Sequence, residues 1–592
     1  MILKERLDDF LAGFDSMYRW IMGHTKEIQH LLDELEKIAD AQKQSPTRIV
    51  CRRTIEYDLA VKSAISPRSL RYGIDFCCEL ELLSWMYTGT TESSRFRKLF
   101  IKEIEALSNL DIPRFEKKLA KIFDFNIMAD RRREKLPGRV QYKLVNLSRE
   151  DYVRQENVVR ATFLAKEMHL RRFSNTTGEC LFQDQIEFDE KKIVKTALLI
   201  GDKIWDLSTE HGAGKEHSWP VAILWEPRAD KFRVGSIGLS LYDGLSGIAL
   251  YFTMLAVVSQ QEQYSERVEL ILNNLSNLLE RDEFRKLMLN TMNLGIASGI
   301  TSLFYSLTVI SEYLSETKYL DLAEEVARLI KEEHIIKDND YCIANGSAGF
   351  ILGCLKLYNN TKNKRYIKKA ETAAYHLVSS RSESRTGHKV WRVFGNHLTG
   401  ASHGAAGISY ALISLYAETE NLDYLTIGLE AIEFENCLFD SAKKNWPDLR
   451  GGRADKQSFA WCHGAPGIGI CRMGLPEIVK SARVEEDISV SIESAIEHLG
   501  KGPLSLCCGD LGRAETILIG ADKRNRTQLI NHITEKLLPN IYSNLPYENK
   551  NLQNSVRGKF FDIGLFQGAA GIGYLLLRVA SPQRVNPILL WK

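Results

Sequence analysis

The sequence predicts an all-α protein built as an α/α toroid, with seven inner and seven outer helices, preceded by a smaller helical domain. Two observations predict the toroid. A glycine motif recurs through the second two-thirds of the chain, and charged amphipathic segments lie between its copies. The period of about 54 residues suits one helical hairpin per repeat. Because no repeat looks like a polar cap, a closed ring is favoured over an open solenoid.

The motif is a small or polar residue, then Gly-x-x-Gly, then an apolar helical stretch. Its copies are YDGLSGIALYF at Tyr242, IANGSAGFILG at Ile343, SHGAAGISYAL at Ser402, CHGAPGIGICR at Cys462, CCGDLGRAETI at Cys507 and FQGAAGIGYLL at Phe566. A weaker copy, GIASGITSLFY at Gly295, is aligned with Gly299 as its second glycine and Ile296 in place of the first. Segments such as Tyr319–Lys331 and Tyr366–Val378 are the predicted outer helices, since their charged residues mark a solvated face.

In a closed ring, the glycine turns of all repeats lie at one end and surround one central cavity. Paired glycines at a helix start also allow a neighbour or ligand to approach closely and leave backbone N–H groups free. The polar residues beside the turns are therefore the candidate functional residues: Asp243, Asn345, His403, Cys462, His463, Cys507, Cys508, Asp510 and Gln567.

Cysteines occupy equivalent motif positions in two neighbouring repeats, at Cys462 and at the Cys507–Cys508 pair. Three thiolates that converge on one point suit Zn2+, and three protein ligands leave a fourth position open, as in catalytic zinc sites. The alternatives are buried structural cysteines with one accidental neighbour, or His463 in place of one thiol. The other eight cysteines are scattered and are expected to be buried structural thiols.

His403 stands at the equivalent turn one repeat before Cys462 and His463. Beside a zinc cavity, an imidazole is a candidate general acid or base, because its pKa lies near neutrality. The alternative is a hydrogen-bonded structural histidine. Asp243, at the first glycine turn, is a further candidate catalytic residue.

These motifs resemble those of a known family. LYDGLSGIAL, ASHGAAGISYAL, WCHGAPGIGICR, LCCGDLGRAE and FQGAAGIGYLLLR resemble the LanC-like cyclase domain of class II (LanM-type) lanthipeptide synthetases, to which residues 186–592 are assigned. The resemblance implies one zinc, held by Cys462, Cys507 and Cys508, and a catalytic His403. The implied reaction forms lanthionine or methyllanthionine. A cysteine thiolate of a precursor peptide adds to dehydroalanine or dehydrobutyrine, and His403 reprotonates the enolate.

Two positions depart from the family pattern. Most members carry Cys-His-Gly where this chain reads Cys507-Cys508-Gly509, so its site resembles an all-cysteine variant. Members also carry Asp four residues before the first glycine of the third motif, whereas here Cys342 stands at that place. If that Asp orients the histidine or handles protons, its replacement slows or abolishes cyclisation.

Residues 1–185 contain no repeat and are assigned to a separate domain. Apolar residues at helical spacing predict helices at Leu3–Met22, Thr25–Gln42 and Tyr152–Glu167. The charged run that begins at Met128 is interrupted by Pro and Gly, which predicts a surface loop.

GFDSMYRW, RIVCRRTIEYDL, EIEALSNLDIPRF and NLSREDYVRQ resemble the last part of the dehydratase domain of the same synthetases. The resemblance implies that Arg48 and Thr54 act in phosphate elimination; the alternative is an ordinary basic surface. No glycine-rich nucleotide loop, strand lysine or catalytic-loop Asp/Asn set is found. We expect a split or truncated synthetase, or a cyclase with a vestigial partial domain, that does not dehydrate Ser or Thr alone. ATP and Mg2+ are expected only if an upstream kinase-like part is supplied.

Composition excludes several function classes. The 592 residues contain 78 Lys+Arg and 76 Asp+Glu, and the net charge of +2 gives no argument for nucleic acid or an anionic membrane. No run approaches the ~18 apolar residues of a membrane span, and MILKERLDDF carries acids where a signal peptide needs an apolar core. A cytoplasmic protein that does not span a membrane is expected.

The leading function is thioether ring formation in a precursor peptide that contains Cys and dehydrated Ser or Thr. The alternative is a catalytically silent peptide-binding subunit or remnant that works with a separate dehydratase. A toroid that acts on glycans would need paired acids at the pore, where this chain carries cysteines. A kinase-like dehydratase half and an export transporter are the other candidate partners.

Overall fold

The chain forms two compact units, which are described separately. The computed structural model describes residues 6–42, 54–65, 70, 73–81, 93–113, 144–145, 147–172, 188–211, 216–219, 222–226, 231–450, 456–521, 526–544 and 562–592. One unit is Asp9–Val153, and the other combines the first eight residues with Arg154–Lys592. In the part of the chain that the structure describes, no helix is long and apolar enough to cross a membrane.

The N-terminal part is helical, as predicted. Its helices are α2 (Leu7–Gly23), α3 (Thr25–Gln42), α4 (Thr54–Ala64), α5 (Gly73–Glu81), α6 (Ser93–Ser108) and α10 (Arg149–Arg172). A small buried cluster joins Tyr57 and Ala64 of α4 to Leu80 of α5 and Leu107 of α6. Arg48 and the run from Met128 lie outside the described residues, and of Thr54 only the place at the start of α4 is described.

Seven apolar helices follow one another around the inside of the second unit. They are α12 (Leu245–Ser259), α15 (Thr301–Leu314), α18 (Ser347–Thr361), α20 (Ala405–Thr419), α22 (Ala465–Met473), α24 (Asp510–Ala521) and α29 (Ala569–Ala580). Each packs against the next, and α29 packs against both α24 and α12. The first twelve residues of α12 are all buried, because an inner helix is covered on every side. The inner helices therefore close into a ring.

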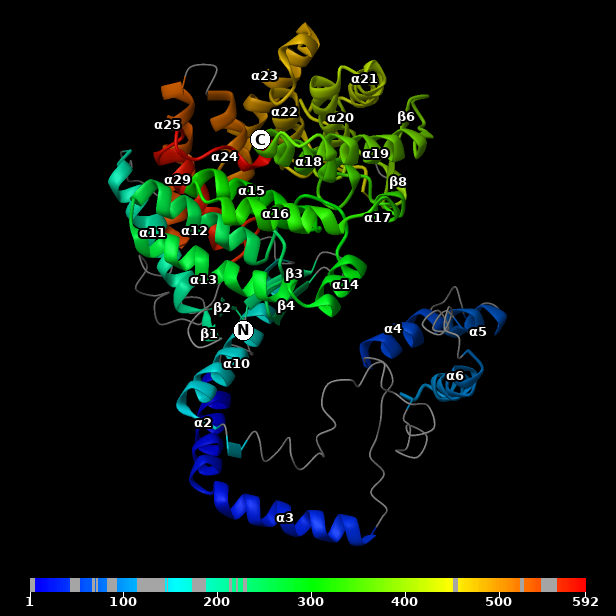
Figure 1. Ribbon diagram of the computed structural model, residues 1–592, viewed down its shortest axis with the longest axis vertical. Coiled ribbons are helices and arrows are strands. Elements are labelled where there is room, and N and C mark those ends of the chain that lie inside the picture. The colour runs from blue at the N-terminus through cyan, green and yellow to red at the C-terminus, as the bar shows by residue number, and fades with distance from the viewer. Residues whose placement is uncertain are drawn as a thin grey trace. The chain divides into compact units, whose positions relative to one another are not determined.

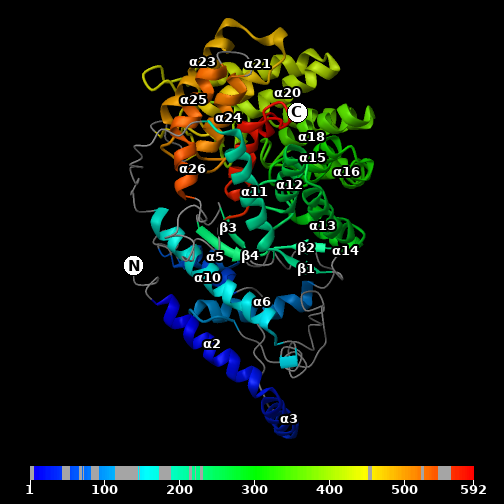
Figure 2. The same cartoon turned by 90° about the vertical axis from the view of Figure 1, so that its left-hand side faces the viewer.

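Seven outer helices cover this ring, one against each inner helix. They are α11 (Glu190–Asp206), α13 (Glu262–Leu279), α16 (Thr317–Leu329), α19 (Arg365–Ser379), α21 (Leu422–Asn436), α23 (Ala482–His498) and α25 (Arg526–Lys536). Six of them follow their inner helix in sequence, whereas α11 precedes the first repeat and packs against α29, the last inner helix. The two ends of the domain thus meet in one helix pair (Figures 1 and 2). The predicted α/α toroid is confirmed.

A backbone hydrogen-bond cycle joins the seven turns that precede the inner helices. In each turn, the N–H group of the residue two places before the first glycine donates to the carbonyl oxygen of its counterpart in a neighbouring turn, at 2.9–3.3 Å. In order of donation the residues are Tyr242, Ala297, Ala344, Ser402, Cys462, Cys507 and Phe566, which donates back to Tyr242. The cycle fixes the register of all seven repeats.

The cycle corrects the alignment of the weak copy. Ala297 takes the place of Tyr242 and Ala344, so Gly299 is the first glycine of its turn and Ser302 stands at the second position. The prediction that Gly299 is the second glycine, with Ile296 as the first, is wrong. The sequence around Gly295 contains two glycines four residues apart, and its spacing does not show that Gly299 occupies the first position of the turn.

The centre of the ring is filled by the C-terminal segment. Trp591 is 2% exposed and its ring stacks on Phe566 at a centroid distance of 6.1 Å. It also packs edge-on against Tyr305 and tilted against Trp461. Phe566 is a member of the cycle, and Trp461 directly precedes the member Cys462. This aromatic cluster therefore supports the turns from the inside of the ring.

Short elements complete the unit. Beside the ring lie α14 (Asp282–Thr291), α17 (Glu332–Ile336), α26 (Leu538–Asn544), η5 (Glu477–Val479) and η6 (Ile588–Leu590). The described strands form four antiparallel hairpins, none of which was predicted: β1 (Thr209–His211) with β2 (Glu216–Ser218), β3 (Ala222–Glu226) with β4 (Lys231–Gly235), β5 (Ser382–Glu383) with β6 (Lys389–Val390), and β7 (Arg392–Val393) with β8 (Asn396–His397). The expectation that all scattered cysteines are buried is also wrong, because Cys77 and Cys437 are exposed.

In six of the seven turns, the second glycine meets the backbone of its own loop; Ser302 takes its place in the other turn. A Cβ on Gly467 would overlap the carbonyl oxygen of Trp461 and lie 3.0 Å from the Cβ of Ala401. We expect Gly467→Ala to lower the free energy of unfolding by more than about 2 kcal/mol, because the backbone must shift. Urea denaturation measures this. In Gly238→Ala, where the added Cβ meets open space, the change should stay below about 0.5 kcal/mol. Equal losses in both variants would contradict the close approach.

Candidate metal centre

The three predicted cysteine ligands lie together at the mouth of the ring. Cys462 precedes α22, and Cys507 and Cys508 precede α24, so adjacent turns of the cycle supply them. The N–H of Cys462 donates to the carbonyl of Cys507 at 3.1 Å, which ties the two turns together. The three sulfur atoms all lie within 4.8 Å of one another. Cys462 and Cys507 are buried, whereas Cys508 is exposed.

This arrangement fits a tetrahedral soft metal. With Zn–S bonds near 2.3 Å, neighbouring sulfur ligands stand about 3.8 Å apart, close to the observed grouping. Hydrogen bonds from Cys462 and Cys507 lower the pKa of the Cys508 thiol, so the cluster already holds one sulfur toward the thiolate form that metals bind. His463, the alternative ligand, does not belong to the group, and its Nδ1 lies 3.2 Å from the carbonyl oxygen of Thr399.

His403 stands two turns from Cys508 along the cycle and is paired with Cys342. The Cys342 sulfur lies 3.2 Å from Nδ1 of His403. Burial raises the pKa of the Cys342 thiol, so at neutral pH the thiol keeps its proton and donates it to Nδ1. In a neutral imidazole, Nε2 then carries the ring proton. Cys342 thus occupies the place that the resemblance assigns to an Asp and holds the histidine by a different hydrogen bond.

The surroundings of His403 keep it neutral. Burial lowers its pKa to about 3, and the nearby His463 and Arg450 add to the shift. The His463 ring stacks on it at 5.9 Å between centroids. Phe394, at the tip of the β7–β8 hairpin, packs edge-on against it at 5.1 Å. His403 is therefore an uncharged imidazole between two rings.

Arg450 brings positive charge to the same end of the ring. Its Nε and Nη2 donate to the two carboxylate oxygens of Asp448 at 2.9 and 2.8 Å. Although burial opposes the shift, hydrogen bonds from Arg450 hold the pKa of Asp448 well below its usual range. Arg450 also helps to lower the pKa of Cys508.

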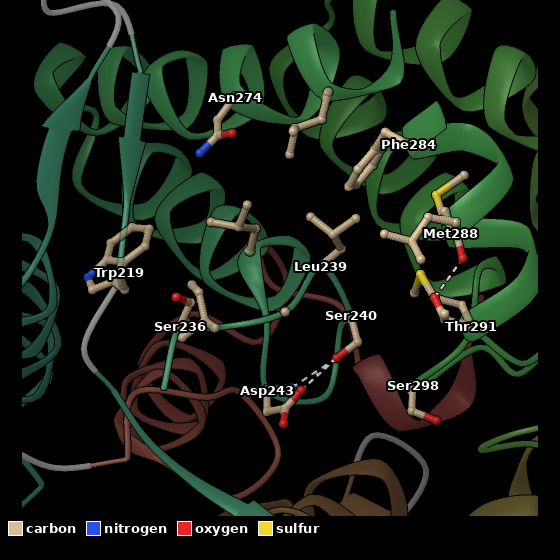
Figure 3. Close-up of a pocket in the computed structure, with 16 residues that line it drawn as sticks. Trp219, Ser236, Leu239, Ser240, Asp243, Asn274, Phe284, Met288, Thr291 and Ser298 are labelled. Atoms are coloured by element: carbon tan, nitrogen blue, oxygen red, sulfur yellow. Dashed lines mark hydrogen bonds between the residues drawn. The ribbon is translucent and has the colours of Figure 1, made fainter. Parts of the chain in front are cut away.

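Asp243 lies away from His403, three turns along the cycle. It accepts a hydrogen bond from the Ser240 hydroxyl at 2.8 Å and lines a cavity on the α13–α14 side (Figure 3). Its neighbour Tyr242 reaches the cysteines instead: Gln567 Nε2 donates to the Tyr242 hydroxyl at 2.6 Å and lies 3.5 Å from the Cys508 sulfur. The structure thus separates Asp243 from the predicted catalytic histidine.

Two further predicted mouth residues are structural. Asp510 is buried, pairs with Arg513 at 2.6 Å, and accepts a hydrogen bond from the Gly502 N–H at 3.0 Å. Asn345 accepts a hydrogen bond from the Ser298 hydroxyl at 2.7 Å. The residues immediately before the first glycine of the seven turns are Asp243, Ser298, Asn345, His403, His463, Cys508 and Gln567.

Comparison with known proteins identifies the family. The family model described as "Lanthionine synthetase C-like protein" matches residues 235–590. The chain belongs to this family. A second family model, a domain of unknown function (DUF4135), matches residues 3–118.

Among the relatives of this LanC-like chain, the lacticin 481/lactococcin biosynthesis protein LcnDR2 of Lactococcus lactis subsp. lactis is 25% identical over 602 residues, which cover 97% of this chain and 59% of that protein. The chain thus spans about three fifths of the length of that relative. This match and the two family models confirm the resemblance to class II lanthipeptide synthetases.

Two solved structures are similar to the LanC-like chain. Nisin cyclase has 18% identity and a TM-score of 0.44, over 60% of this chain and 92% of that protein. A GH76 α-mannanase of Bacteroides thetaiotaomicron has 11% identity and a TM-score of 0.34, over 67% of this chain and 97% of that protein.

Sequence reasoning missed Phe394, Asp448 and Arg450. Each lies outside the glycine motif, Phe394 in a hairpin tip and the ion pair in the loop between α21 and α22. The one available signal was local: NWPDLRGG places an acid and a base two residues apart among apolar residues and glycines. Nothing in that string indicates which turn the pair approaches.

The lowered pKa of Cys508 predicts its reactivity. In metal-free protein we expect iodoacetamide to alkylate Cys508 before the exposed Cys437, because a lowered pKa keeps the thiolate populated at lower pH. The pH at half-maximal rate should fall below the ordinary thiol value of about 8.5. Peptide mapping by mass spectrometry measures both rates. Faster labelling of Cys437 at pH 7 would show that the thiol hydrogen bonds do not activate Cys508.

Proposed function

We propose that this chain is a lanthionine-forming peptide cyclase, whose LanC-like part is residues 186–592. The observation that carries the proposal is the grouping of Cys462, Cys507 and Cys508 at the ring mouth, near a histidine. Such a site suits the addition of a peptide thiol to a dehydrated residue in the same peptide. The family match over residues 235–590 supports it.

The three sulfur atoms would hold one Zn2+. When bound, the metal supplies Lewis acidity that lowers the pKa of a substrate thiol. Buried Cys462 and Cys507 fix the inner side of the site, while exposed Cys508 leaves it open to a peptide. The Gln567 side chain, which bridges Tyr242 and Cys508, steadies the exposed sulfur.

The reaction needs one proton to leave and one to arrive. The substrate thiol loses its proton, its sulfur bonds to the β-carbon of dehydroalanine or dehydrobutyrine, and the α-carbon gains a proton. His403 holds a proton on Nε2 and is the donor. As it gives up that proton, the Cys342 S–H can pass its own to Nδ1. A proton from solvent then returns to Nε2, and Nδ1 gives its proton back to the Cys342 sulfur. A thiol relay of this kind is slower than donation by an imidazolium, because burial disfavours the Cys342 thiolate.

The pairing of Cys342 with His403 also favours the alternative function, a catalytically silent peptide-binding subunit. Because the pKa of His403 is lowered to about 3, its imidazolium form is hardly populated at neutral pH, and the neutral ring is a poor proton donor. A silent peptide-binding subunit would show the same property. The substrate peptide would still bind at the mouth in that case. The two functions differ in turnover and share the binding site.

We further propose that residues 1–185 are the end of a dehydratase domain that works with a separate kinase-like part and needs ATP and Mg2+ only then. The match of DUF4135 to residues 3–118 supports the assignment to a dehydratase domain. In that arrangement Arg48 and Thr54 would act in phosphate elimination. An export transporter for the product is a further proposed partner.

Elemental analysis tests the metal site without a substrate. We expect about one zinc per chain in the wild type and a sharp loss in Cys508→Ala, because two thiols hold Zn2+ more weakly than three. The matched control is Cys471→Ala, which removes a buried thiol on α22 outside the cluster. Near-zero zinc in folded wild-type protein would contradict the metal site.

Loss of free peptide thiol tests the reaction, because ring closure leaves the mass unchanged. With a dehydrated, Cys-containing peptide, we expect the wild type to consume the peptide thiol. His403→Ala should slow this consumption at least tenfold. General acid catalysis contributes about 10²-fold or more to the rate of a reaction, and a neutral imidazole is expected to contribute less than that. Alkylation followed by mass spectrometry counts the remaining thiols.

Cys342→Asp separates the two functions. A carboxylate beside Nδ1 raises the pKa of a histidine, so this variant should close rings about tenfold faster or more and gain a pH dependence near neutrality. If neither the wild type nor Cys342→Asp consumes thiol although zinc is bound, the cyclase proposal falls and the binding function remains.

A further inference from the structure

A cavity of about 530 Å3 opens beside the first two turns of the ring. Its walls come from the loop before α12, from the end of α13, from α14, and from Trp219 after β2 (Figure 3). The volume falls within the range of about 300–1,000 Å3 that encloses small organic ligands. It therefore has room for more than one side chain.

Most of the lining is apolar. Leu239 lies between Trp219 on one side and Phe284 and Met288 on the other (Figure 3). Leu278 also lines the cavity, and so does Leu287, which is 57% exposed. Apolar surface that remains open to solvent indicates a site for another apolar group. Polar groups stand on both sides of the cavity: Asn274 lies at one edge, and Ser240, Asp243 and Ser298 lie at the opposite edge (Figure 3).

That edge belongs to the ring mouth. Asp243 and Ser298 both stand immediately before the first glycine of their turns, as Cys508 and Gln567 do. The path to the cysteines is continuous: Asp243 adjoins Tyr242, whose hydroxyl contacts Gln567, which reaches the Cys508 sulfur. The cavity and the cysteine cluster are thus connected through neighbouring side chains at the ring mouth.

We propose that this cavity binds a bulky apolar segment of the precursor peptide while the cysteine of the same peptide lies at the cluster. The proposal rests on the proposed function and adds its substrate class: peptides with neighbouring large apolar residues at a distance from the reacting cysteine. Asp243, whose Oδ1 is held by Ser240, offers an acceptor for a peptide N–H at the edge. The occupant is a peptide, because only an extended chain can reach from the cavity to the cysteine cluster.

Binding of paired synthetic peptides tests the proposal. Both peptides carry dehydroalanine, cysteine and a fluorescein label, and they differ only in a Phe-Leu pair that becomes Ser-Asn in the second. A small series of such peptide pairs places this dipeptide at successive distances from the cysteine. By fluorescence anisotropy with zinc-loaded full-length chain, we expect the best Phe-Leu peptide to bind about tenfold more tightly than its Ser-Asn partner.

Two matched lysine variants locate the site. Leu287→Lys puts a charge at the cavity rim and should abolish most of the tenfold preference, while binding of the Ser-Asn peptide stays the same. Leu422→Lys changes an equally exposed leucine on α21 (65%), outside the cavity, and should leave the preference intact. Circular dichroism and zinc content confirm that both variants are folded.

The outcomes separate the cavity from the reaction. Equal affinity for both peptides at every spacing, an unchanged preference in Leu287→Lys, or no binding of either peptide would overturn the cavity proposal. Thiol consumption without an apolar preference leaves the cyclase proposal standing alone. An apolar preference lost in Leu287→Lys, without thiol consumption, supports the cavity and counts against the cyclase.

Discussion

The cycle of backbone hydrogen bonds at the ring mouth is the constraint on which the rest of the domain depends. It runs through one residue of each turn and returns to its start at Tyr242, so every turn is held by two others. In six of the seven turns, a Cβ at the second glycine would overlap a carbonyl oxygen of the same loop, which is why that glycine recurs. The side chains of the cycle and of the residues that follow it are then free to vary. Within one short motif, the glycines thus determine the fold, and the variable side chains before them determine the chemistry.

This division explains how residues far apart in sequence form one site. Cys462 and Cys507 are both members of the cycle, and their sulfurs are brought together because the backbone bond between them fixes adjacent turns. The pairing of α11 with α29 closes the ring by joining its two ends. Opening that pair would release the turn at Phe566, and with it Gln567, which contacts both Tyr242 and Cys508. The cysteine cluster therefore depends on contacts made at the far ends of the domain.

The repeat made the toroid, the inner helices and the three cysteines predictable from sequence, because all of them follow from spacing. The weak copy was misaligned, since Gly295 and Gly299 offer two alignments and only the backbone bond of Ala297 decides between them. Phe394 and Arg450 could not be predicted, because hairpins and loops between repeats carry no periodic signal. Asp243 and His403 occupy the same position in their motifs, but this position determines only where each residue stands within its own turn. The distance around the ring decides which residues meet.

The pairing of Cys342 with His403 changes the proton chemistry of the site more than its shape. A carboxylate at that position would accept a hydrogen bond from Nδ1 and stabilise an imidazolium, whereas a protonated thiol donates to Nδ1 and stabilises the neutral ring. Arg450 and His463 push in the same direction, since positive charge near His403 lowers its pKa further. The negative charge on Cys508, the thiol whose pKa is lowered, opposes this and raises the pKa of His403. Because zinc binding would neutralise much of that negative charge, loading the cluster should make His403 still harder to protonate. A cyclase with this pair would therefore deliver the proton through the neutral ring.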